Sequence, residues 1–127
     1  MRLSELQSID GVLEEELRDP AFRREWERTA LARAVAIDVI RHRASRGLSQ
    51  RALAEVLEWK PAQVARLEQA NHSPSIETLL HLSRRLGLHF AVSIGPAEAP
   101  SGLRTKKSDV IQDIEDDEGT RFLVAAG

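Results

Sequence analysis

The chain has 127 residues, which is enough for one compact domain with extensions. It contains no cysteine, and this excludes disulfide bonds and thiolate metal sites. Its formal net charge is −2, and no apolar run is long enough for a membrane span or a signal peptide, so we expect a cytoplasmic protein with no membrane contact.

Residues 1–30 are expected to form a helical extension. Apolar side chains recur near helical spacing at its start, although Gly11 interrupts them. Asp19 and Pro20 then stand as an N-cap and a first helical residue, which predicts a helix start. Because no breaker occurs before Arg46, we expect one long helix or two abutting helices that continue into the next domain.

Residues 47–86 have the pattern of two short helices, a tight turn between them, and a third helix. Ser49 precedes the first apolar run and can cap a helix with its hydroxyl group. Pro61 follows the turn and is pre-set for the first position of the second helix. Two short helices joined so briefly must cross steeply, and the second one then projects in a way that fits a major groove.

After Gly87 the apolar period changes from helical to alternating, which predicts a strand over residues 88–94. Its apolar side consists of Leu88, Phe90, Val92 and Ile94. A single strand in a helical chain cannot satisfy its own backbone groups, so we expect it to pair with its copy in a second subunit. Residues 96–127 combine a linker, an acidic run and an apolar end, and we expect a flexible tail that orders on a partner.

The motif resembles the helix-turn-helix of the phage repressor, Cro and antitoxin superfamily. The resemblance is carried by Gly47-Leu48-Ser49-Gln50, Leu53-Ala54, Val64, Arg66-Leu67-Glu68, Leu79, Leu82, Leu86 and Gly87. It covers about half of the chain and implies a mainly α, lambda-repressor-like bundle in residues 31–95. Family members usually have glycine where Glu58 and Ala70 stand, so we expect a reshaped turn, with Asn71 taking over the helix end.

The resemblance also assigns roles to individual side chains. DNA contacts are expected from Gln50, Arg51, Lys60, Pro61, Ala62, Gln63, Arg66 and Arg46. Polar reading of bases falls to Gln63 and Arg66, because proline and alanine can at most touch a thymine methyl group. The remaining arginines, including Arg41, are phosphate contacts or plain solvated charges with even odds. Arg43 and Glu68 are implied to form a structural ion pair rather than a DNA contact.

Positive charge gathers in the part of the chain that holds the motif. Residues 31–95 carry a balance of +4, whereas residues 1–30 and 96–127 each carry −3. This segregation is typical of a protein whose basic middle segment binds phosphates while its acidic terminal segments bind another partner. Candidate contacts to a partner protein are Phe22, Trp26, Ile111, Ile114, Phe122 and Leu123. For the aromatic pair, packing of the N-terminal helix against the DNA-binding domain is the favoured interpretation, and for the acidic run it is a solubilising tail; partner contact is the alternative in both cases.

The four histidines share no ligand spacing, and no nucleophile motif or glycine-rich loop is present, so we expect no metal, no cofactor and no catalysis. The leading hypothesis is a homodimeric repressor of operator DNA. Within it the chain resembles HigA-type antitoxins, which implies a toxin protein as partner and repression of the chain's own operon. One alternative is a stand-alone regulator of the same fold. Another is an interaction adaptor that binds no DNA, which the weak Pro61-Ala62 start of the second helix favours.

Overall fold

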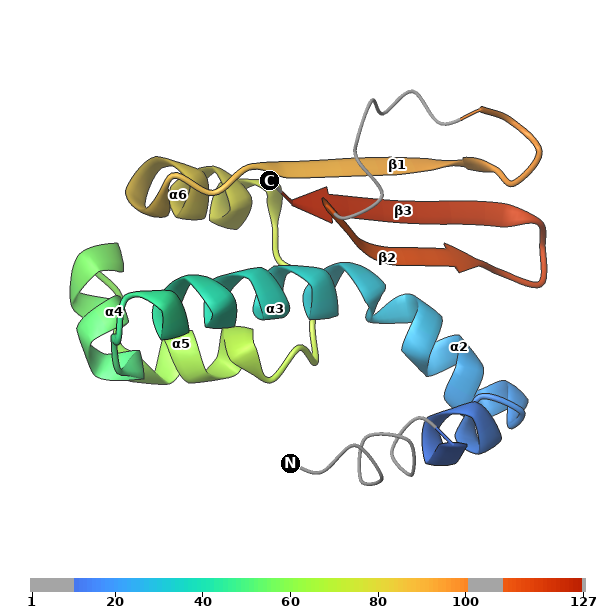
Figure 1. Cartoon of the computed structure of the whole chain (residues 1–127), viewed down its shortest axis with the longest axis horizontal. Helices are drawn as coiled ribbons and strands as arrows, with labels where there is room; N and C mark the ends of the chain where they lie inside the picture. The colour runs from blue at the N-terminus through green and yellow to red at the C-terminus, as the bar shows by residue number, and fades with distance from the viewer. Residues whose placement is uncertain (1–10, 101–108, 127) are drawn as a thin grey trace.

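The computed structural model describes residues 11–100 and 109–126. The start of the expected N-terminal helix and part of the expected linker lie outside these residues. Residues 11–16 are helical. The elements that follow are α2 (Pro20–Arg28), α3 (Ala30–Ser45), α4 (Gln50–Leu57), α5 (Pro61–Glu68), α6 (Ile76–Leu86), β1 (Phe90–Pro96), β2 (Val110–Glu115) and β3 (Thr120–Ala126) (Figure 1). The expectation of a mainly helical chain with a helix-turn-helix bundle is confirmed.

Three of the helices, α2, α4 and α6, begin at a residue whose side chain caps them. Asp19 accepts a hydrogen bond from the backbone N–H of Ala21 at 2.9 Å, and Ser49 accepts one from that of Ala52 at 3.0 Å. The long helical stretch is two abutting helices, separated at Thr29. The Thr29 hydroxyl group donates to the Glu25 carbonyl at 2.9 Å and thereby closes the last turn of α2.

The core lies between α3 and the three helices that follow it. Its completely buried side chains are Val35, Val39, Leu53, Leu57, Val64 and Leu82. α3 crosses the middle of the molecule, with α4 at one of its ends, α5 along one side and α6 and the sheet along the other (Figure 1). α3 thus ties the helix-turn-helix to the sheet.

The strand after α6 finds its partner within the same chain, so our argument for a necessary partner in a second subunit is wrong. The sheet is antiparallel with the order β1-β3-β2, and Ile94, Phe122 and Ile114 lie side by side in its register. The expectation of an unstructured tail is also wrong for residues 110–126. A tight turn joins the last two strands: Asp116 Oδ1 accepts from the N–H of Thr120 at 2.8 Å, and Gly119 adopts a φ of 77°.

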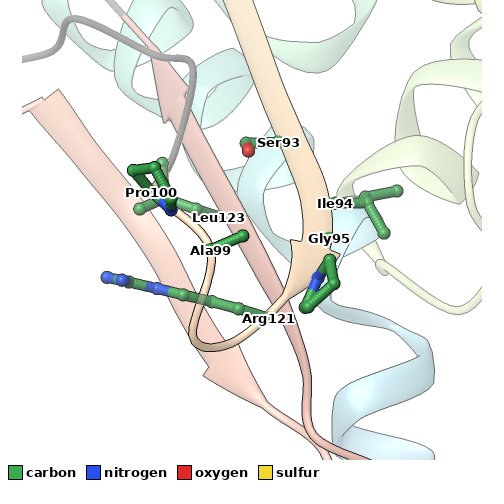
Figure 2. A pocket seen from close by; sticks show the side chains of 8 residues that line it. Ser93, Ile94, Gly95, Ala99, Pro100, Arg121 and Leu123 are labelled. Atoms are coloured by element: carbon green, nitrogen blue, oxygen red, sulfur yellow. The ribbon is translucent and has the colours of Figure 1, made fainter.

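The two faces of the sheet have different neighbours. Val124 is buried on the face toward α3, and the Gln112 side chain there accepts a hydrogen bond from Arg33 at 2.9 Å. On the other face, Figure 2 shows Leu123 and Ser93 in a hollow of about 280 Å³ beneath Pro100, while the Ile94 side chain points away from it. The C-terminal strands therefore belong to the packed body of the protein.

Candidate DNA-binding surface

The turn between α4 and α5 keeps the left-handed geometry without glycine. Glu58 ends α4 with a φ of 58°, and its carboxylate accepts a hydrogen bond from Arg85 at 2.8 Å. Ala70, with the same φ, follows α5. A side chain in this region costs about 1–2 kcal/mol, and the chain keeps the conformation nonetheless. Our expectations of a reshaped turn and of Asn71 as the helix-ending residue are therefore wrong.

Trp59 holds the turn against the rest of the domain. It is half-buried, packs on the core and stacks on the His81 ring, with 5.5 Å between centroids. The His81 Nε2 atom lies 2.7 Å from the Leu57 carbonyl oxygen, so the imidazole also satisfies the end of α4. This histidine is occupied by packing and a backbone hydrogen bond.

The two sides of α5 differ in exposure. Val64 is completely buried. The opposite side presents the exposed residues Pro61, Ala62, Gln63 and Arg66, with Lys60 at the N-cap. Arg66 makes no ion pair with any carboxylate in residues 11–100 or 109–126. A guanidinium group in this position is available for a phosphate or for the acceptor edge of guanine.

Gln63 has a local task that the sequence analysis did not assign. Its Oε1 atom accepts a hydrogen bond from the Lys60 backbone N–H at 2.8 Å, as the third residue of a capping box does. One of the two acceptor positions of the amide oxygen is therefore engaged, which ties the orientation of the side chain to the N-cap. Since adenine reading by glutamine uses both halves of the amide, Arg66 is the stronger candidate for base reading.

The start of α4 and the end of α5 are joined by a three-residue network. Glu68 Oε1 accepts from Arg43 Nε at 2.8 Å, and Glu68 Oε2 accepts from Gln50 Nε2 at 2.6 Å. The Glu68 side chain is only 6% exposed. Arg43 also donates to the Leu48 carbonyl at 3.2 Å. The network fixes the angle between the two helices and orients the exposed Gln50.

The other arginines of the surface are less constrained. Arg46 lies 3.0 Å from the His42 ring nitrogen Nδ1, one helical turn earlier on α3. Arg41 and Arg51 are exposed. A hollow of about 270 Å³ beside α5 adds residues that the sequence analysis missed, among them His72, Ser73, Ser75 and Thr78. Their only signal in the sequence was a polar loop that ends in the N-cap of α6.

Most of the candidate partner contacts are used inside the chain, as the favoured interpretation of Phe22 and Trp26 expects. Trp26 stacks on Phe22 with 6.2 Å between centroids, and the Arg33 guanidinium lies 3.5 Å above the Trp26 ring. Arg33 also donates to the Trp26 carbonyl at 2.6 Å, and burial lowers its pKa to about 10, so it stays charged at neutral pH. Leu123 is buried in the sheet, while Phe122 and Ile114 line a hollow of about 320 Å³ beside α2. Ile111 lies at a bulge in β2.

The residues expected to mediate dimerisation divide into two groups. Leu88 and Phe90 pack against the helical core. Val92 and Ile94 are 37% and 66% exposed on β1. β1 is an outer strand of the sheet, so β3 occupies one of its edges and no strand of residues 11–100 or 109–126 pairs with the other.

Comparison with known families agrees with this geometry. The helix-turn-helix family model matches residues 39–92, which contain α4, α5 and α6. The curated proteins and the solved structures give no match. Within the described residues no helix is long and apolar enough to cross a bilayer, and no cluster of acidic or histidine side chains is arranged to hold a metal ion. The match supports a helix-turn-helix of the repressor and Cro type, a family of DNA-binding transcription regulators.

Proposed function

We propose that this protein is a sequence-specific transcriptional repressor that reads operator DNA with α5. The observation that carries the proposal is the two-sided character of this helix. Val64 anchors it in the core, while Arg66 is exposed and unengaged by any carboxylate of the described residues. The network around Glu68 holds α4 and α5 as one rigid unit, which lets a short helix enter the major groove in a fixed orientation.

The division of labour on this surface follows from chemistry. Arg66 would donate two hydrogen bonds to a guanine, and Lys60 and Gln50 would meet phosphates on either side of the groove. Pro61 and Ala62 leave room for a thymine methyl group at the N-terminal end of α5. Because most of these contacts are to phosphates, the affinity should fall steeply with salt concentration.

Enrichment of bound sequences from a random double-stranded DNA pool tests this function. The repressor proposal predicts a palindromic consensus whose half-sites are separated by about 10 base pairs or a multiple of that spacing. Enrichment without a consensus would reduce the protein to a non-specific DNA binder. No enrichment from the full chain would refute DNA reading and favour the adaptor alternative.

We further propose that the repressor is a homodimer joined through the open edge of β1. The two outer edges of the sheet differ in a way that supports this choice. β2 has a bulge at Val110–Gln112 and carries Asp113 and Glu115, features that protect an edge against pairing. β1 runs from Phe90 to Pro96 without a charge or a bulge. Within the described residues no strand pairs along this edge, and Pro96, at its very end, is the one residue of β1 that opposes the pairing of a second copy.

Within the repressor class we propose an antitoxin that binds a toxin and represses its own operon. The acidic ends on either side of a basic middle support a basic partner. A hollow of about 390 Å³ between α2 and β2 has apolar walls and is also lined by Arg23, Glu27, Asp113 and Glu115. Glu27 pairs with Arg23 and Asp113 pairs with Arg121, so within the described residues Glu115 is the carboxylate of this lining that makes no ion pair. A basic side chain with an aliphatic stem would fit such a lining.

Co-expression with the product of the adjacent reading frame tests the antitoxin role. A stable complex and relief of growth arrest are expected, and Glu115→Lys should weaken the complex at least tenfold. Glu98→Lys, an equal charge change outside the hollow, is the matched control. If the adjacent product neither binds nor arrests growth while operator binding persists, the protein is a stand-alone regulator.

A further inference from the structure

α6 has an apolar stripe on its solvent side that nothing in the described residues covers. Ile76 is 69% exposed and Leu80 is 46% exposed, one helical turn apart. Leu82 and Leu86, on the opposite side of the same helix, are buried in the core. The helix is thus apolar on two sides, although only one of them faces this chain's own core.

The charges beside the stripe have a self-complementary arrangement. Glu77 and Arg84 are exposed, lie seven residues apart, and stand on the side of the helix that carries Leu80. Neither forms an ion pair within the part of the chain that the structure describes. If two copies of α6 pair antiparallel about a two-fold axis next to Leu80, the Glu77 of each copy lies beside the Arg84 of the other. The symmetry therefore produces two equivalent ion pairs.

We propose that the stripe of Ile76 and Leu80 is an interface that binds the α6 helix of a second copy of this chain. Leu80 packs against its own copy at the axis, and Ile76 packs along the aliphatic stem of the facing arginine. The two ion pairs fix the antiparallel register. A basic or an acidic partner of another kind would leave one of the two charges facing a like charge.

This contact is separate from the proposed strand pairing. Figure 1 shows α6 and β1 end to end along one side of the molecule, so their centres are distant from one another. When two copies of an element pair antiparallel, the two-fold axis passes between them, next to the centre of the element. Because the centres of α6 and β1 are distant, the two pairings need two different axes. A chain that uses both surfaces forms dimers through β1 and joins these dimers through α6.

Sedimentation velocity of the full chain over a range of concentrations tests the proposal. The wild type should form a species twice the size of the dimer. Leu80→Glu and Glu77→Arg should each raise its dissociation constant at least tenfold, and the double variant Glu77→Arg/Arg84→Glu should bring it back to within about threefold of the wild type. Val56→Glu is the matched control, because Val56 is an equally exposed apolar residue of α4 outside the stripe.

The outcomes separate this proposal from the DNA-binding function. Charge reversals also oppose the dipole of α6, so thermal unfolding is recorded for each variant, and an association change without a folding change supports the interface. Unchanged association in Leu80→Glu, or an equal loss in Val56→Glu, would overturn it. Affinity for a single operator should be the same for Leu80→Glu and the wild type. Failure of the wild type to bind any operator would refute the repressor and leave the α6 result intact.

Discussion

Arg43 in α3 and Glu68 at the end of α5 form an ion pair with 2.8 Å between Nε and Oε1, although 25 positions separate them in the sequence. The pair connects the helix before the motif to the helix that would read DNA. Because Gln50 shares the same carboxylate, one side chain sets the position of three helices.

Replacing Arg43 with alanine should lower the free energy of unfolding by about 2–3 kcal/mol, because the carboxylate of Glu68 would remain almost buried with a single neutral donor. Urea unfolding followed by circular dichroism measures this change. Arg51→Ala serves as the control, since Arg51 is exposed and should cost less than about 0.5 kcal/mol. Equal effects in the two variants would show that the pair does not stabilise the fold.

The positive φ angle of Ala70 predicts a stabilising substitution. Ala70→Gly should raise the free energy of unfolding by about 1 kcal/mol, because glycine adopts a φ of 58° without the steric penalty of a Cβ atom. Glu58→Gly should gain less, because it also removes the hydrogen bond with Arg85. Thermal unfolding of both variants beside Ala62→Gly, where glycine should destabilise α5, checks the order. A destabilised Ala70→Gly variant would contradict it.

Acidification should destabilise the domain in a window set by His42. Burial lowers the pKa of this imidazole, the charge of Arg46 adds to the effect, and Asp38 opposes it. The unfolded chain therefore takes up the proton first, and stability is lost as the pH falls from about 6.5 through the lower pKa of the folded state. Urea unfolding at about pH 7.5 and about pH 5.5 should show this loss in the wild type and a smaller one in His42→Gln. An identical loss in both would assign it to other groups.

If the dimer forms through the edge of β1, a lysine in β1 and a lysine in β2, the other outer strand, should have different effects. Ile94→Lys should weaken the dimer, because a charge on an edge strand opposes pairing and Ile94, 66% exposed, would lie beside the strand of the second copy in an antiparallel pairing centred on Ser93. Glu115→Lys, on the outer strand β2, should leave the dimer unchanged. Size-exclusion chromatography with light scattering distinguishes the two. A dimer that survives Ile94→Lys would contradict the β1 interface.

The helices could be predicted from the sequence because their signals are local. Caps at Asp19 and Ser49 and the apolar period of α6 each act over a few residues, so one sequence is enough to find them. The strands β2 and β3 were not predicted, because their stability depends on pairing with residues distant in the sequence. Acidic residues dominate the segment around Ile114, and its alternation has meaning only when Phe122 and Ile94 pair beside it.

The candidate site divides in the same way. The exposed side of α5 was predicted from spacing, because Val64 fixes which side faces inward. The capping role of Gln63 depends on the backbone conformation of Lys60, and the use of Trp26 by Arg33 depends on how α2 meets α3. Residue spacing predicts neither the capping role of Gln63 nor the contact between Trp26 and Arg33. Both interactions change which atoms of these side chains are available to a partner.

We propose above all that Arg66 on α5 reads a base of the operator. Fluorescence anisotropy with the enriched operator and its single-base variants, for the wild type and for Arg66→Ala, tests it most directly. Arg66→Ala should lose about 1–3 kcal/mol of binding free energy on the operator and should no longer distinguish the bases at one position of each half-site. An equal loss on every DNA sequence, with the base preferences intact, would contradict it.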